Sequence, residues 1–123
     1  MSHEAFAQGD LRIDVEEHQG VLKLTWTGKS NARNPSQLLA PFFAPLVESA
    51  RSSGSTLSLD FEKLEHFNSS TITAIILLIQ ECRSKGLRLS LRFDPRVKWQ
   101  KLSFDALRVF VKPDGLLELV PIG

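Results

Sequence analysis

Three hydroxyl side chains, Ser69, Ser70 and Thr71, follow Asn68 in the middle of the sequence. Apolar residues precede the run and an isoleucine- and leucine-rich stretch follows it, so a buried strand is expected to lead into a buried helix here. Asn68 or a serine can cap such a helix by accepting a hydrogen bond from a free backbone N–H group. A phosphate on one of the hydroxyls is also favoured, because the helix end carries partial positive charge. The run therefore indicates either a simple cap or a phosphorylation site.

Enzymatic chemistry is the first alternative at this position. His66 lies only three residues before Ser69, and a serine and a histidine so close on one loop do not form a catalytic triad. The sequence also lacks a Gly-x-Ser-x-Gly nucleophile elbow. Asp60 and Glu62 are not accompanied by a carboxylate on a second helix that could act with them as an acid–base pair. We expect no catalytic residue.

Metal and cofactor chemistry have equally little support. His3, His18 and His66 show none of the spacings of metal-binding motifs. Cys82 is the only cysteine, so neither a disulfide within the chain nor a cysteine metal cluster can form. We predict no metal and no cofactor, and a reducing compartment suits the single thiol.

The length of the chain and its net charge limit the remaining functional classes. A chain of 123 residues that is 42% hydrophobic is expected to form one domain over residues 1–123. Its 15 lysines and arginines nearly balance 14 aspartates and glutamates, which gives no general attraction to nucleic acid. The N-terminus lacks a basic region followed by an apolar stretch, and no run reaches the roughly 18 apolar residues needed to span a bilayer. We expect a cytoplasmic protein without membrane insertion.

The first half of the chain predicts a β-hairpin and a helix. Apolar and polar residues alternate over 11–17 and 21–29, with a short turn between them. Ser36 follows loop residues and can cap a helix over about 36–52. Two prolines inside this helix each remove a backbone donor, so we expect it to be bent or divided into two pieces. These prolines are Pro41 and Pro45.

The second half alternates strands with helices. Alternation over 55–61 and 87–93 predicts two more strands, and helical spacing predicts a central helix over 69–85, ended by Gly86. The third helix is expected over about 95–107. Its cap is predicted to be Asp94, and two short strands around a turn at 112–115 complete the chain. The order predicts an α/β fold, a single mixed β-sheet packed against helices, with one sheet face thinly covered.

The central helix is apolar on more than one side. We expect one set of residues to face the sheet: Ile72, Ile75, Ile76 and Ile79. A second set lies on or near the other side: Ala74, Leu77 and Leu78. This second set is either covered by neighbouring elements or part of a partner-binding surface.

The stretch LSLDFEKLEHFNSSTITAIILLIQECRSKGLRLSLRF resembles the middle of a STAS domain, the fold of the anti-sigma factor antagonists. In that family an apolar strand ends in Asp, and a few residues lead to Asp-Ser followed by Ser or Thr and then Gly. An apolar helix comes next, and a basic residue and Gly precede the following strand. The matching residues here are Asp60, Leu64, Phe67, Ser69, Ser70, Ile72, Lys85, Gly86 and Leu87. The resemblance covers roughly residues 20–107.

Two positions depart from the family pattern. Asn68 stands where the family usually has Asp, and Thr71 stands where it has Gly. The form with Asn is similar to STAS-like bacterial regulators related to the biofilm regulator SiaC, in which a threonine directly after Asn is phosphorylated.

The resemblance implies a non-enzymatic bacterial regulatory protein that acts by protein–protein binding and is switched by reversible serine phosphorylation. The implied phosphoacceptor is Ser69, with Ser70 as second choice. The implied partners are a kinase of the anti-sigma type with an ATP-binding domain and a PP2C-type phosphatase, or another regulatory protein. The expected partner-binding residues are Asp60, Asn68, Ser69, Ser70, Thr71, Ala74 and Leu78. The alternative is a STAS-fold subunit of a larger transport or sensory complex that binds constitutively.

Overall fold

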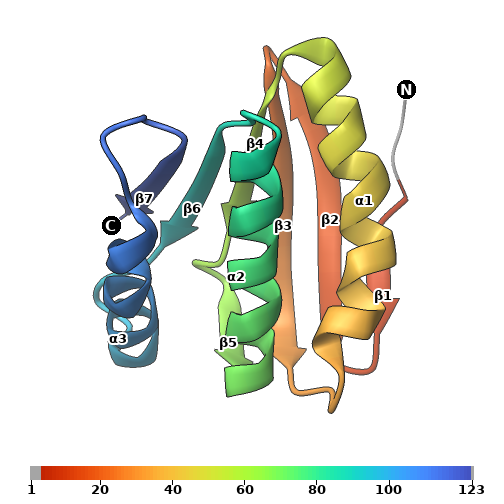
Figure 1. Ribbon diagram of the computed structural model, residues 1–123. Helices are drawn as coiled ribbons and strands as arrows, with labels where there is room; N and C mark the ends of the chain where they lie inside the picture. Colours follow the sequence, from red (N-terminus) through yellow and green to blue (C-terminus); the bar gives the residue numbers. More distant parts are fainter. Residues whose placement is uncertain (1–3, 123) are drawn as a thin grey trace.

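One mixed β-sheet carries all the helices on one of its faces (Figure 1). The computed structural model describes residues 4–122. Its elements are β1 (Phe6–Gln8), β2 (Leu11–His18), β3 (Val21–Ser30), α1 (Pro35–Ser53), β4 (Thr56–Asp60), β5 (Leu64–Phe67), α2 (Ser69–Ser84), β6 (Leu89–Phe93), α3 (Lys98–Ala106), a 3₁₀ turn η1 (Leu107–Phe110) and β7 (Leu117–Pro121). The predicted α/β fold with a single mixed sheet is confirmed.

The strand order is β1-β2-β3-β4-β6-β7, and β5 pairs with β3 beyond the end of β4. β1, β2 and β3 are antiparallel neighbours, whereas β3, β4, β6 and β7 run parallel. Parallel neighbours require helical crossovers, and α1, α2 and α3 supply them. In Figure 1 α1 and α2 lie side by side across the sheet, and α3 lies apart from them, below β6.

The predicted hairpin is confirmed by the pairing of β2 with β3, from Leu11 opposite Gly28 to His18 opposite Val21. Its buried face carries Leu22, Leu24 and Trp26, as expected from their alternation. Gly28 is required where β3 shifts its register, because its φ is +84° and a Cβ atom there would lie 1.8 Å from the carbonyl oxygen of Asp10.

Helix α1 is one continuous helix, not two pieces. It begins at Pro35, and Asn34 occupies the N-cap position, so the prediction that Ser36 caps the helix is wrong. Both internal prolines, Pro41 and Pro45, are exposed, so the carbonyl groups that lose their partners can be solvated. The opposite face holds the helix on the sheet through Leu39, Phe43, Leu46, Val47 and Ala50.

The predictions for the C-terminal part of the chain are partly wrong. Asp94 does not cap α3, because its carboxylate accepts a hydrogen bond from the backbone N–H of Arg96 at 2.9 Å and closes a turn instead. Helix α3 therefore starts at Lys98, three residues later than expected. Of the two tail strands only β7 forms, since residues 107–110 make the 3₁₀ turn η1.

The residues of α2 that are buried differ in part from those predicted to face the sheet. Ile75 and Ile79 are fully buried, but Ile72 and Ile76 are only half-buried. Ala74 and Leu78 are 4% and 3% exposed, because α1 covers this side of α2. Of the two alternatives for this second set, coverage by a neighbouring element therefore holds for Ala74 and Leu78. Leu77 is 51% exposed.

The thiol of Cys82 lies in the core beneath α2, where it is 1% exposed. Burial disfavours the thiolate and raises the pKa of Cys82 from 9.0 to about 12. We expect iodoacetamide at pH 8 to leave the folded protein unmodified and to label it fully in denaturant, as read by intact mass. Because the folded-state pKa exceeds the unfolded value of 9.0, the stability that Cys82 contributes is complete below pH 9 and is lost between pH 9 and about 12. Rapid labelling of the folded protein at pH 8 would contradict this placement.

Candidate functional site

The site is built around the first turn of α2, which Asn68 caps as predicted. The side-chain Oδ1 of Asn68 accepts hydrogen bonds from the backbone N–H of Thr71 at 2.9 Å and from the Thr71 hydroxyl at 2.7 Å. A side-chain acceptor at this position satisfies one of the free donors of the helix end. No acidic residue lies in the first turn of α2, so its partial positive charge is not neutralised there.

Asn68 also ties the helix end to the loop between β3 and α1. Its side-chain Nδ2 donates to the carbonyl oxygen of Ala32 at 2.9 Å, and its backbone N–H donates to the carbonyl oxygen of Ser30 at 3.0 Å. The hydroxyls of Ser30 and Thr71 lie 2.7 Å apart, and both residues are buried. An aspartate carboxylate could not donate to Ala32, so asparagine makes a hydrogen bond here that an aspartate could not.

The three consecutive hydroxyls therefore differ in access. Thr71 is 0% exposed and its hydroxyl is held by Asn68 and Ser30, whereas Ser69 and Ser70 are exposed. A modifying enzyme can reach only an exposed hydroxyl in the folded protein. The structure thus leaves Ser69 and Ser70 as the accessible hydroxyls at the start of α2.

Asp60 lies on the other side of the sheet from this site. Leu57 and Leu59 face the helices, and the alternation of β4 turns Asp60 to the face without helices. Its carboxylate is 3.6 Å from Lys23 Nζ and 3.8 Å from Arg92 Nε. Of the expected partner-binding residues, the structure brings together Asn68, Ser69, Ser70 and Thr71 but not Asp60, Ala74 or Leu78.

His66 does not contact a serine. It is exposed on β5, and its ring centre lies 6.1 Å from that of Trp99. Among the side-chain hydrogen bonds within residues 4–122, none joins His66 to a hydroxyl group. The geometry of a nucleophile beside its general base is not formed here.

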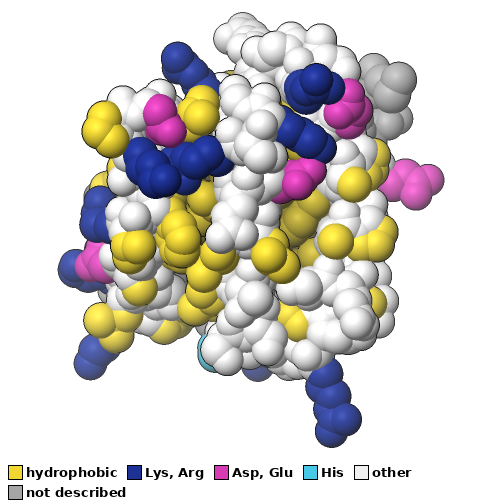
Figure 2. All heavy atoms as spheres, viewed as in Figure 1, with side chains coloured by type: hydrophobic (Ala, Val, Ile, Leu, Met, Phe, Trp, Pro, Cys, Tyr) yellow, Lys and Arg dark blue, Asp and Glu magenta, His cyan; other side chains and the backbone are white. Residues whose placement is uncertain are grey.

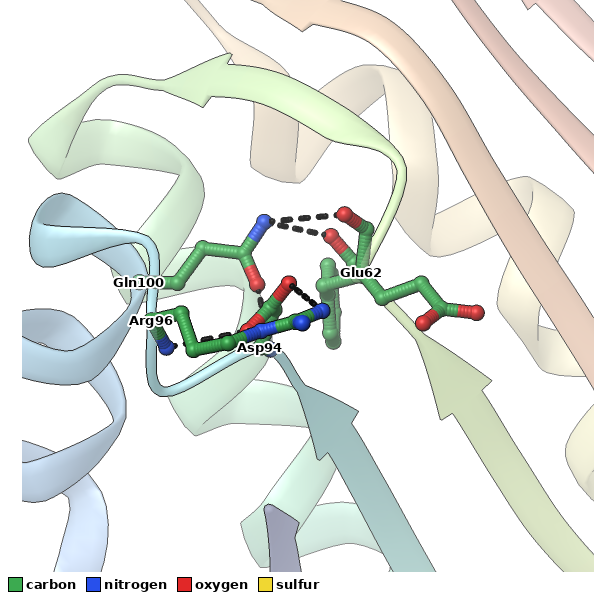
Figure 3. Close-up of polar contacts among 5 residues, drawn as sticks. Glu62, Asp94, Arg96 and Gln100 are labelled. Atoms are coloured by element: carbon green, nitrogen blue, oxygen red, sulfur yellow. Dashed lines mark hydrogen bonds and ion pairs between the residues drawn. The ribbon is translucent and has the colours of Figure 1, made fainter. Parts of the chain in front are cut away.

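Gln100 is a positioning residue that the sequence analysis missed (Figure 3). It is fully buried on α3, and its Nε2 donates to the carbonyl oxygens of Phe61 at 2.8 Å and Leu64 at 3.2 Å. Its Oε1 accepts from the backbone N–H of Asp94 at 2.7 Å. Gln100 thus fixes the connection between β4 and β5, and β5 leads directly to Asn68. The sequence signal that could have shown Gln100 to be buried is its position four residues before Phe104, because residues four apart lie on the same side of a helix.

Ser30 is the second missed residue. It shares the even-numbered alternation of Leu22, Leu24 and Trp26 on β3, which is the pattern of an inward-facing position. An inward-facing serine needs a buried partner, and Thr71 provides it.

The architecture is shared with solved structures. An anti-sigma factor antagonist from Mycobacterium paratuberculosis superposes with a TM-score of 0.61 at 14% sequence identity, over 95% of this chain and 92% of that chain. The chain has the STAS-like fold. An uncharacterized protein with a SpoIIAA-like fold from Shewanella loihica matches with a TM-score of 0.51 at 17% identity, over 97% and 89% of the two chains. No protein-family model matches the sequence, and the search of curated proteins also finds no match.

In this STAS-like fold the hydroxyl run, Ser69, Ser70 and Thr71, lies at the start of α2, directly after the connection from β5. The same run is part of the sequence stretch that resembles a STAS domain. The narrower likeness to regulators related to SiaC stays a prediction. None of the helices within residues 4–122 combines the length and the apolar character needed to cross a membrane.

Proposed function

We propose that the chain is a non-enzymatic regulatory protein whose binding to a protein partner is switched by reversible phosphorylation of Ser69. The observation that carries this proposal is the separation of the hydroxyl run into a buried, hydrogen-bonded Thr71 and an exposed Ser69, at a helix N-terminus whose first turn holds no acidic residue. A phosphate on Ser69 adds about −1.5 to −2 charge at neutral pH. In the free protein the helix end favours that charge, whereas in an interface the charge must be desolvated.

The expected partners are a kinase of the anti-sigma type and a PP2C-type phosphatase. Two points support them: the STAS-like fold shared with an anti-sigma factor antagonist, and the match of Ser69 to that family's phosphoacceptor position. The kinase binds the unmodified form, and the phosphatase restores it.

The proposal can be tested by releasing a captured partner with ATP. Immobilised wild-type protein and the Ser69→Ala variant are loaded with partner from the native cells and then washed with Mg·ATP. We expect ATP to release the partner from the wild type, because Ser69 becomes phosphorylated, and to leave it on Ser69→Ala. Release from both proteins, or from neither, would count against the switch. A wash with Mg·ADP is the control for nucleotide binding alone.

The second candidate is a STAS-fold subunit of a larger transport or sensory complex that binds constitutively. Asn68 favours it, because the bond from its amide to Ala32 fixes the loop beside α2 without any phosphate. In that case the partner remains bound to both proteins under Mg·ATP.

A further inference from the structure

The outward side of α3 and η1 carries the two most exposed large hydrophobic side chains in the described part of the chain. Val109 is 75% exposed and Leu102 is 62% exposed. Ala106 between them is also exposed, and Val111, which directly follows η1, is 42% exposed. Single exposed apolar residues are normal on a protein surface, but several on one side of one element indicate a binding surface.

Helical spacing joins these residues into one stripe. α3 and η1 are contiguous, and Leu102, Ala106 and Val109 follow one another at i, i+4 and i+7, which places them on one side of a helix. The buried residues repeat this spacing on the opposite side; they are Gln100, Phe104 and Leu107. Because that buried side holds the segment on the protein, the apolar stripe faces outward.

Cations outnumber carboxylates along this segment, and the ion pairs within it do not remove the excess. Residues 94–113 contain five lysines and arginines against two carboxylates, Asp94 and Asp105. Asp105 is shared by two cations, since its carboxylate lies 2.6 Å from Lys101 Nζ and 3.2 Å from Arg108 Nε. Asp94 pairs with Arg96 at 3.0 Å. The segment therefore stays positive after its own pairs are formed.

Two lysines stand at the ends of the apolar stripe without a partner. Lys98 lies before Leu102 and Lys112 lies after Val109, and both lysines are exposed. Neither forms an ion pair with another of the residues that the structure describes, 4–122. Figure 2 shows hydrophobic side chains between lysine and arginine side chains along its left edge, where Figure 1 places α3.

Neighbouring elements do not reverse this charge. Asp114, the next carboxylate along the chain, is 3.3 Å from Arg83 of α2 and is thus paired from outside the segment. The β4–β5 connection, which approaches Arg96, adds one exposed group of each sign, Glu62 and Lys63 (Figure 3). The surface formed by α3, η1 and Lys112 therefore remains basic.

An exposed apolar stripe framed by cations is complementary to an anionic lipid surface. Leucine and valine can enter the boundary between headgroups and acyl chains, while lysine stems lie along the apolar surface and carry their ammonium groups to the lipid phosphates. Nucleic acid would use the cations but gain little from Leu102 and Val109. A protein partner would need a groove shaped for this helix side, whereas a lipid surface deforms around it.

We propose that the outward side of α3 and η1 binds the surface of an anionic lipid bilayer, with Leu102 and Val109 at the headgroup–acyl boundary and Lys98 and Lys112 on lipid phosphates. The association is peripheral and reversible, because only a few side chains enter the lipid. It goes beyond the proposed switch and does not depend on Ser69.

The charge part of the proposal is tested by sedimenting the purified full chain with vesicles of equal parts phosphatidylcholine and phosphatidylglycerol. We expect binding to these vesicles, little binding to phosphatidylcholine alone, and release at high salt. Lys98→Gln combined with Lys112→Gln should lower the partition coefficient by about tenfold or more. The control, Lys29→Gln combined with Arg33→Gln, removes the same charge from exposed positions on β3 and the following loop and should change it by less than about twofold.

The apolar part has its own matched pair of variants. Leu102→Ser combined with Val109→Ser should lower the partition coefficient by about tenfold or more, because the stripe then has little to insert. Leu77→Ser, at a leucine that is 51% exposed on α2, should leave it unchanged. All substituted side chains are exposed, and circular dichroism checks that each variant is folded.

Three results would overturn the proposal: no binding to the anionic vesicles, equal binding to neutral and anionic vesicles, or equal losses in the stripe variants and their controls. Capture of an acidic protein by the wild type but not by the stripe variants, without vesicle binding, would identify a protein-binding surface instead. Ser69→Ala should sediment like the wild type, so a failed phosphorylation switch is distinguishable from a failed lipid site.

Discussion

We expect Ser69→Asp to bind its partner about 100-fold or more weakly than Ser69→Ala, because an unpaired anion in a closed interface costs several kcal/mol. The free variant remains folded. Ser69 is exposed at the N-terminus of α2, where a negative charge stabilises the helix by up to about 1 kcal/mol. Titration calorimetry with the captured partner measures the affinities, and thermal unfolding of the free variants measures their stability.

Ser84→Asp is the matched control for this effect. Ser84 is also exposed, but it lies in the last turn of α2, at the opposite end from Ser69. The same substitution there is expected to leave the partner affinity unchanged and to lower stability slightly, since a negative charge opposes the helix dipole at a C-terminus. Equal affinities of Ser69→Asp and Ser69→Ala would count against the switch and support constitutive binding.

Gln100→Leu is expected to lower the free energy of unfolding by roughly 2–5 kcal/mol. The leucine fits a similar volume but leaves the Asp94 backbone N–H and the carbonyl oxygens of Phe61 and Leu64 without their buried partner. Each unsatisfied buried group costs about 1–3 kcal/mol, and relaxation with water recovers part of the sum. Urea unfolding followed by tryptophan fluorescence measures the change.

Gln80→Leu is the control for Gln100→Leu. Gln80 is exposed on α2, so its replacement should change stability by no more than about 0.5 kcal/mol. A loss for Gln100→Leu as small as that for Gln80→Leu would mean that the β4–β5 connection holds its shape without the buried amide.

The position of the site could be predicted from the sequence because local signals agree there. Helical spacing after Ser70 predicts where the helix begins, and asparagine is a strong N-cap residue, whereas the strand was predicted over 55–61 and β5 was not predicted. The hydrogen bond between Ser30 and Thr71 could not be predicted in the same way, because it joins residues 41 positions apart. Such pairs depend on sheet topology and on the register shift after Gly28.

The errors have a common cause in competing local structures. Asp94 can cap a helix or close a turn with the backbone of Arg96, and the ion pair with the Arg96 side chain favours the turn. Helical spacing showed that α2 is apolar on several sides, but it could not show that α1 rather than a partner covers Ala74 and Leu78.

The central claim is tested most directly by intact mass spectrometry of the protein isolated from its native cells, followed by mapping of any phosphate to its residue. We predict a population that carries one phosphate on Ser69 and that disappears in the Ser69→Ala variant. Protein that is never phosphorylated under any growth condition, or a phosphate found on the buried Thr71, would contradict the account.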